Sequence, residues 1–246
     1  RTGYTTFENA QASGGGKDLV WHDPASGEEE VLVAAHAFRP NPRSGPLSIE
    51  EHHWAENGSK LLLFTNSRRV WRSNTRGDYW VFDVSSRELR QIGADLAPSS
   101  LMFAKFSPDA RRVAYVHENN LYVEDLRDGS RTQLTQDGGE TVVNGTFDWV
   151  YEEEFHLRDG FRWSPDGKSI AYWQLDTEGV RDFYLINNTA GLYPEIAAIP
   201  YPKTGQTNSA ARVGVVSAEG GATRWVDLPG DPREHLAMMR LEARRA

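Results

Sequence analysis

Residues Trp163-Ser-Pro-Asp-Gly-Lys-Ser-Ile-Ala-Tyr-Trp173 combine an aromatic residue, a tight turn and a short apolar strand. Pro presets the backbone at the first central position of such a turn, and Asp and Gly tolerate the bend that follows. The same order occurs in Phe106-Ser-Pro-Asp-Ala-Arg-Arg-Val-Ala-Tyr-Val116 and in Trp54-Ala-Glu-Asn-Gly-Ser-Lys-Leu-Leu-Leu-Phe64. The leading aromatic residues stand at positions 54, 106 and 163, which are 52 and 57 residues apart. A repeat of about 50 residues is typical of β-propeller blades.

Segments that resemble β-hairpins complete each repeat. They alternate apolar and polar residues around turn-forming Gly, Ser, Asp and Pro, and they cover residues 19–33, 78–92, 120–134 and 213–228. At about 50 residues per blade, the 246 residues hold four to five blades. We therefore expect an all-β chain, with residues 1–246 forming an incomplete β-propeller of four-stranded blades. An all-β sandwich is the alternative fold.

The composition excludes several classes of protein. A net charge of −8 argues against a nucleic-acid partner, since nucleic-acid-binding proteins carry a basic face. The mean hydropathy is −0.60, and apolar runs such as Leu61–Phe64 are far shorter than a membrane span, so none is expected. Without cysteine there is no thiolate catalysis and no cysteine-bound zinc. The seven histidines show no metal-ligand spacing, so we expect neither metal nor cofactor.

Two segments interrupt the repeat. The first, Asp148-Trp-Val-Tyr-Glu-Glu-Glu-Phe155, is too acidic for a buried strand and contains helix formers after an aromatic lead. The second is the tail at 233–246, which is basic and helix-prone and lacks the aromatic residue that would begin another blade. We expect both to depart from the strand pattern.

Four stretches give the chain a resemblance to the dipeptidyl peptidase IV group of prolyl-oligopeptidase-like serine peptidases. They are Arg69-Val-Trp-Arg72 with Asp78-Tyr-Trp80, the acidic run Asp148–Glu154, Trp163–Gly167, and Tyr201-Pro-Lys-Thr-Gly205 with Asn208. The resemblance implies an N-terminal propeller followed by an α/β-hydrolase domain. No Gly-x-Ser-x-Gly sequence occurs here, so we expect the catalytic domain, with its Ser, Asp and His, to lie outside this chain.

The resemblance also implies which residues bind substrate. Members of the group remove dipeptides from free N-termini, usually after Pro or Ala, and paired carboxylates suit the ammonium group. By resemblance these carboxylates are Glu153 and Glu154, whereas Glu152 is expected to make a structural contact. Neighbouring residues on a regular helix do not face each other, so the pair can converge only at a short helical turn or its end. From composition alone, the run is equally compatible with a solvated acidic bulge.

Arg72 matches the arginine that, in this group, hydrogen-bonds a substrate carbonyl from the propeller side. A guanidinium group is planar, permanently charged and forked, which suits that contact. The sequence places Arg72 in a loop at 66–77 between two strands, where binding residues are common. A surface position in an arginine-rich loop is the alternative, because Arg68, Arg69 and Arg76 are also candidates.

These observations favour the recognition propeller of a serine dipeptidyl peptidase, with a peptide bearing a free N-terminus as partner and no catalytic residue within the chain. Two alternatives remain. One is a non-catalytic propeller that binds a peptide or protein; the other is an acylaminoacyl- or oligopeptidase-type propeller, which would not need the paired glutamates. We further expect a periplasmic or secreted location, a possible homodimer, and a bacterial source, given 22 Arg against 5 Lys.

Overall fold

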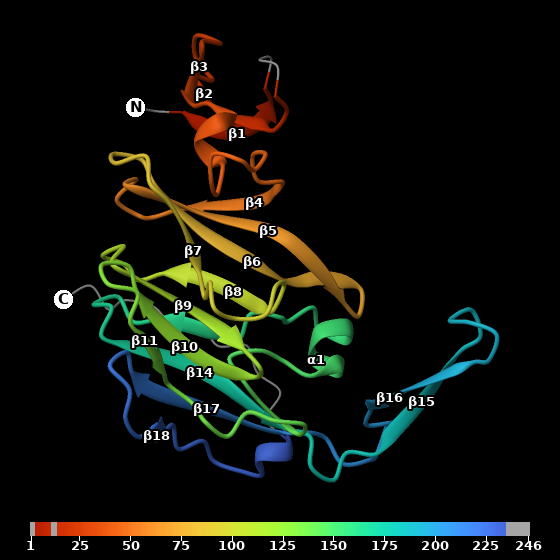
Figure 1. Cartoon of the computed structure of the whole chain (residues 1–246). Helices are drawn as coiled ribbons and strands as arrows, with labels where there is room; N and C mark the ends of the chain where they lie inside the picture. The colour runs from red at the N-terminus through yellow and green to blue at the C-terminus, as the bar shows by residue number, and fades with distance from the viewer. Residues whose placement is uncertain (1–2, 11–13, 235–246) are drawn as a thin grey trace.

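The computed structural model describes residues 3–10 and 14–234. Within these ranges the chain is all-β apart from three short helices, which confirms the expected fold class. The antiparallel sheets follow one another from the N-terminal to the C-terminal end, and none is closed (Figure 1). The number of blades stays a prediction.

The first sheet has three strands in sequence order, and a short 3-10 helix follows it. Its elements are β1 (Tyr4–Asn9), β2 (Lys17–His22), β3 (Glu29–Val33) and η1 (Ala35–Phe38). The expected hairpin at 19–33 is confirmed as β2 and β3, whereas β1 was not predicted.

The second sheet has eight strands, which form two four-stranded meanders. The first contains β4 (Ile49–Trp54), β5 (Lys60–Val70), β6 (Ser73–Asp83) and β7 (Leu89–Ile92). The second contains β8 (Leu101–Phe106), β9 (Arg112–His117), β10 (Asn120–Asp125) and β11 (Arg131–Gln133). A single residue pair, Gly77 with Leu101, joins the two meanders through β6 and β8.

The third sheet surrounds the long strand β14 (Ser169–Asp176). Its other members are β12 (Val142–Asn144), β13 (Phe161–Trp163), β17 (Ala210–Ser217) and β18 (Arg224–Trp225). Both β12 and β13 pair with β14, so they are two halves of one edge. The helix α1 (Trp149–Glu154) lies in the chain between these halves, which confirms the predicted interruption of the strand pattern.

A separate two-stranded sheet extends away from the other sheets. It consists of β15 (Asp182–Asn187) and β16 (Glu195–Pro200), and it projects from the molecule as a hairpin (Figure 1). This hairpin was not predicted. The described chain ends at η2 (Pro232–Glu234), and the remainder of the helix-prone tail lies outside the described residues.

The three repeated turns share one geometry, as their sequences predict. In each, a backbone N–H donates to the carbonyl three residues earlier: Gly58 to Ala55, Ala110 to Ser107, and Gly167 to Ser164. The donating residue has a positive φ in all three copies, at 68°, 55° and 67°. Glycine suits this left-handed backbone in two copies, and the third tolerates alanine.

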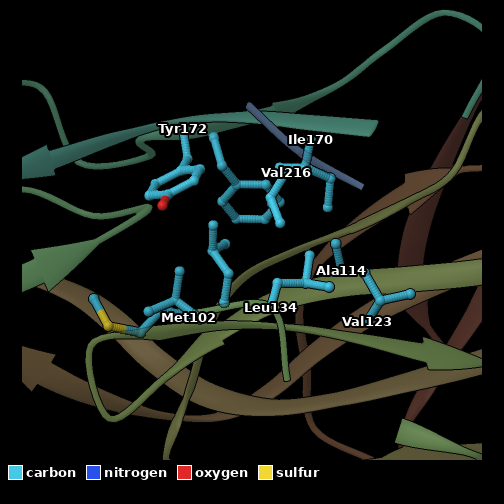
Figure 2. Packing of buried hydrophobic residues seen from close by; sticks show 10 residues of the cluster. Met102, Ala114, Val123, Leu134, Ile170, Tyr172 and Val216 are labelled. Atoms are coloured by element: carbon cyan, nitrogen blue, oxygen red, sulfur yellow. The ribbon is translucent and has the colours of Figure 1, made fainter. Parts of the chain in front are cut away.

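Hydrophobic clusters fill the space between consecutive sheets. Figure 2 shows the one between the second and third sheets, where Met102 and Leu134 approach Tyr172 and Val216. Related clusters join the two meanders and connect the first sheet to β5 and β6. Because burial of apolar surface is the main favourable term in folding, these clusters hold the sheets in series.

The predicted loop at 66–77 is wrong. Strand β5 continues to Val70 and β6 begins at Ser73, so a long hairpin replaces the loop. Its ladder contains irregularities between Thr65 and Arg69, and its turn is Trp71-Arg72. The polar, exposed residues of these strand ends lack the apolar alternation that marks a half-buried strand, which is why the sequence suggested a loop.

Candidate substrate-binding site

The helix α1 lies in a segment that leaves the third sheet at Gly145 and returns to it at Gly160, and hydrogen bonds join the two ends of this segment. Gly145 N–H donates to the Trp173 carbonyl, and Trp173 N–H donates to the Gly160 carbonyl, each at 2.8 Å. Gly160 N–H also donates to the Gly145 carbonyl at 3.0 Å. A Cβ on Gly160 would lie 2.9 Å from the Gly145 carbonyl carbon, so this close approach requires glycine. The segment therefore begins and ends at one point of the sheet.

Arg72 and Glu153 form the central contact of the site. The Arg72 Nε atom lies 2.8 Å from Glu153 Oε2, and the Arg72 backbone N–H donates to Oε1 at 3.2 Å. The Glu153 side chain is 3% exposed, whereas the Arg72 side chain is 74% exposed. Two predicted site residues that stand 81 positions apart are thus brought together. One residue, Arg72, contacts both carboxylate oxygens of Glu153.

Glu154 lies in a different environment from its neighbour. It is the last residue of α1 and is exposed, whereas Glu153 is buried. Among the described residues, no cation forms an ion pair with Glu154. Its carboxylate is therefore accessible from solvent beside the Arg72–Glu153 pair. Joint binding of one ammonium group by both carboxylates stays a prediction.

Glu152 lies beside Arg158, and its structural role stays a prediction. Its side chain is buried, and Oε1 lies 3.5 Å from Arg158 Nε, a distance too long for a good hydrogen bond. Burial raises the pKa of Glu152, and the nearby Arg158 guanidinium opposes that rise. Arg158 was not predicted; an arginine four residues after the acidic run was the available signal.

The competing arginines lie elsewhere on the hairpin. Arg68 and Arg76 face each other across the ladder, and Arg69 Nε donates to the Trp71 carbonyl at 3.0 Å. Within the described ranges, Arg72 is the only one of the four that contacts α1. Trp71, its neighbour in the turn, is 45% exposed and has a φ of 52°.

The fourth stretch of the resemblance contacts α1 through Tyr201. The Tyr201 ring is 5.2 Å from the Trp149 ring in an edge-to-face arrangement. Asn208 Nδ2 donates to the Arg233 carbonyl at 3.3 Å. In the described part of the chain, no group of three or more His, Asp or Glu side chains could hold a metal ion.

Antiparallel sheets in series, with an acidic helix set against an arginine at a hairpin turn, define a propeller-type region with a charged site. The chain belongs to the family described as the dipeptidyl peptidase IV (DPP IV) N-terminal region, whose model matches residues 55–239. Nothing in the described ranges is a helix long and apolar enough to span a bilayer.

Two comparisons show the extent of the similarity. Dipeptidyl aminopeptidase B of Saccharomyces cerevisiae is 32% identical over 209 residues, which cover 83% of this chain and 25% of the relative. The crystal structure of Porphyromonas gingivalis dipeptidyl peptidase 4 superimposes with a TM-score of 0.80 at 28% identity, covering 94% of this chain and 32% of that one. The chain thus spans about a quarter of the curated relatives. The curated relatives, from Saccharomyces cerevisiae and Emericella nidulans, are fungal, so they do not support the expected bacterial source.

Proposed function

We propose that this chain is the substrate-recognition region of a serine-type dipeptidyl aminopeptidase, and that Glu153, Glu154 and Arg72 bind the first two residues of a peptide. The observation that carries the proposal is the contact between Arg72, at a hairpin turn, and Glu153, on an inserted helix. The relatives are dipeptidyl aminopeptidases by name, and the site supplies groups that suit such a substrate.

The charges of the site suit a free N-terminus. Glu153 pairs with the Arg72 guanidinium group, and the adjacent Glu154 is exposed and unpaired among the described residues, so the site has an excess negative charge that attracts an ammonium group. An arriving ammonium group meets the exposed Glu154 first and then competes with Arg72 for Glu153. The released guanidinium group is then free to donate to the carbonyl of the bound dipeptide, because its side chain is largely exposed.

The same contacts set the length of the product. If the helix carboxylates hold the ammonium group, the peptide advances no further, and the bond after the second residue reaches the catalytic group. We propose that an α/β-hydrolase domain outside residues 1–246 supplies a serine that attacks the carbonyl of the second residue. The peptide bond breaks, the rest of the peptide leaves as an amine, and water hydrolyses the acyl-enzyme to release the dipeptide and regenerate the serine. Pro or Ala is the proposed second residue, and the proposed location is periplasmic or secreted.

A second copy of the chain is the proposed partner of the β15–β16 hairpin. Every residue of β15 is exposed, including Tyr184 at 63% and Ile186 at 62%. On β16, Ile196 is 68% exposed and lies opposite Ile186. A two-stranded hairpin is marginally stable in water unless another surface covers it. The possible homodimer would provide that cover.

Isosteric substitution tests the proposed binding of the ammonium group. In the complete enzyme, Glu153→Gln or Glu154→Gln should lower kcat/KM for a free-amine Xaa-Pro reporter about 10- to 100-fold, because a charge-assisted hydrogen bond is lost. An N-acetylated reporter, which has no ammonium group, should be cleaved as by the parent enzyme. Glu178→Gln, a change at an exposed glutamate after β14, serves as the control.

Equal losses on the free and acetylated reporters would refute this role of the two glutamates. A complete protein that binds free-amine peptides without cleaving them would favour the alternative of a non-catalytic peptide-binding propeller.

A further inference from the structure

The helix that carries both glutamates cannot hold its own position. It has six residues, and isolated helices shorter than about 12 residues are marginal in water. Aromatic packing holds it against the third sheet, where Tyr151 stacks on Phe147 at 5.5 Å and joins a cluster that includes Trp173. Apolar packing is non-directional, so it does not by itself fix the direction in which Glu153 and Glu154 point.

Asp148 supplies the directional contacts at the start of the helix. Its Oδ1 accepts a hydrogen bond from Tyr151 N–H at 3.0 Å, as an N-cap residue does. Its Oδ2 accepts a hydrogen bond from the Ser209 hydroxyl at 2.5 Å. Both oxygens of one partly buried side chain are therefore used, one within the helix and one outside it.

Ser209 lies on a rigid part of the molecule. It is 5% exposed and immediately precedes β17, which pairs with β14 from Ala210 to Ser217 without a register shift. Burial raises the pKa of Asp148, whereas the hydrogen bonds from Ser209 and the helix backbone lower it. The carboxylate is thus withdrawn from water and depends on these donors.

We propose that Asp148 and Ser209 are positioning residues, which orient the helix so that Glu153 meets Arg72 and Glu154 faces the substrate ammonium group. This role rests on the proposed function of the two glutamates. Neither residue touches the substrate. They hold the helix in place because the Ser209–Asp148 hydrogen bond joins the N-cap of the helix to the residue just before the first residue of β17.

Substitution of Ser209 tests the role with a small change. In the complete enzyme, Ser209→Ala removes one hydroxyl and should raise KM for the free-amine Xaa-Pro reporter about tenfold, the typical effect of losing a hydrogen bond to a charged group. The kcat for this reporter, and kcat/KM for its N-acetylated form, should stay within about twofold. Ser209→Thr keeps the hydroxyl and should restore KM. Ser217→Ala, at the other end of β17, is the matched control.

The possible outcomes separate the two proposals. If Glu153→Gln and Glu154→Gln abolish the preference for the free amine while Ser209→Ala behaves like Ser217→Ala, the positioning role is wrong and the binding role stands. If Ser209→Ala reduces both reporters equally, the hydrogen bond has only a structural role, and the positioning proposal is again overturned. If the two glutamate variants keep the preference for the free amine, the proposed function itself fails.

Discussion

Glu153 is a buried carboxylate whose two oxygens both face one residue. The side chain of that residue, Arg72, is mostly exposed, so the ion pair lies at the edge of the solvent and is partly screened. The Arg72 backbone N–H, which does not depend on the side chain, donates a second hydrogen bond to Glu153. This arrangement allows a second cation to replace the guanidinium group without leaving the carboxylate unpaired.

The two residues should therefore be energetically coupled. In the complete enzyme, Arg72→Ala and Glu153→Gln should each lower kcat/KM for the free-amine reporter. The double variant should lose less than the product of the two effects, with a coupling of about 1 kcal/mol, because residues in direct contact are not additive. A double-mutant cycle on kcat/KM measures this coupling, and strictly multiplicative losses would show that the contact plays no part in binding.

At the scale of elements, the β15–β16 hairpin and the third sheet contrast in burial. Strand β14 is buried along nearly its whole length between β12, β13 and β17. Strand β15 has the same apolar character in Phe183-Tyr-Leu-Ile186 but is exposed throughout. An exposed apolar surface of this kind marks an interaction site more often than a free surface.

The proposed homodimer predicts the effect of charge on this hairpin. Ile186→Glu combined with Ile196→Glu places two like charges opposite each other on an exposed ladder, so a dimer formed there should dissociate at least tenfold more readily. Sedimentation velocity of the complete protein measures the change. Val31→Glu, a change at another exposed aliphatic residue, is the control. A monomeric parent protein, or a variant that dimerises normally, would exclude the hairpin as the dimer contact.

At the scale of the whole molecule, polar contacts supplement the hydrophobic clusters between sheets. Lys105, on β8, lies 2.5 Å from Asp159, which precedes β13, and its ammonium group lies 3.5 Å from the centre of the Phe161 ring. Burial lowers the pKa of Lys105 to about 8, and the nearby Asp159 opposes that shift. A lysine between two sheets thus links the protonation state to the stability of their packing.

The stability of the protein should depend on this lysine above neutral pH. Its pKa is about 8 in the folded state and near the ordinary lysine value of 10.5 when unfolded, so between these values the unfolded chain binds more protons. The contribution of Lys105 to the free energy of unfolding therefore rises with pH across this window. Lys105→Met removes that contribution, while Arg162 still pairs with Asp159 at 2.9 Å.

Urea denaturation at pH about 7 and about 10 measures the effect. The free energy of unfolding of the parent protein, minus that of the variant, should increase with pH. The contributions of the other titrating groups cancel in this difference because both proteins carry those groups. A difference that is independent of pH would show that Lys105 titrates normally in the fold.

Local chemistry made part of this structure predictable. The three turns that follow Trp54, Phe106 and Trp163 adopt their geometry because turn-forming residues, drawn from Pro, Asp, Asn and Gly in each copy, act within four or five residues. The interruption at Asp148–Phe155 was also predictable from local sequence, because its acidic residues do not suit a buried strand and are helix formers. Contacts between residues far apart in the sequence were not predictable from local chemistry. Nothing in the local sequence links Arg72 to Glu153, and only the resemblance indicated that both belong to the site.

The missed elements also have physical causes. The ends of β5 and β6 carry polar residues on both faces, and β15 is exposed on both faces, so neither shows the alternation that burial imposes on one side of a strand. Ser209 gave no signal at all, because a single serine before a strand is common. Its contact with Asp148 joins residues 61 positions apart, which no local pattern indicates.

The hydrogen-bonded ends at Gly145 and Gly160 make the segment that carries the helix an insert in the third sheet. The edge formed by β12 and β13 continues on both sides of Trp173, so the backbone pairing of this edge is made without residues 146–159. One continuous segment thus carries the helix and its carboxylates, and the same segment contributes Phe147, Tyr151 and Asp159 to the packing of the sheets. The same boundary offers a graft point at which a different recognition loop could be installed.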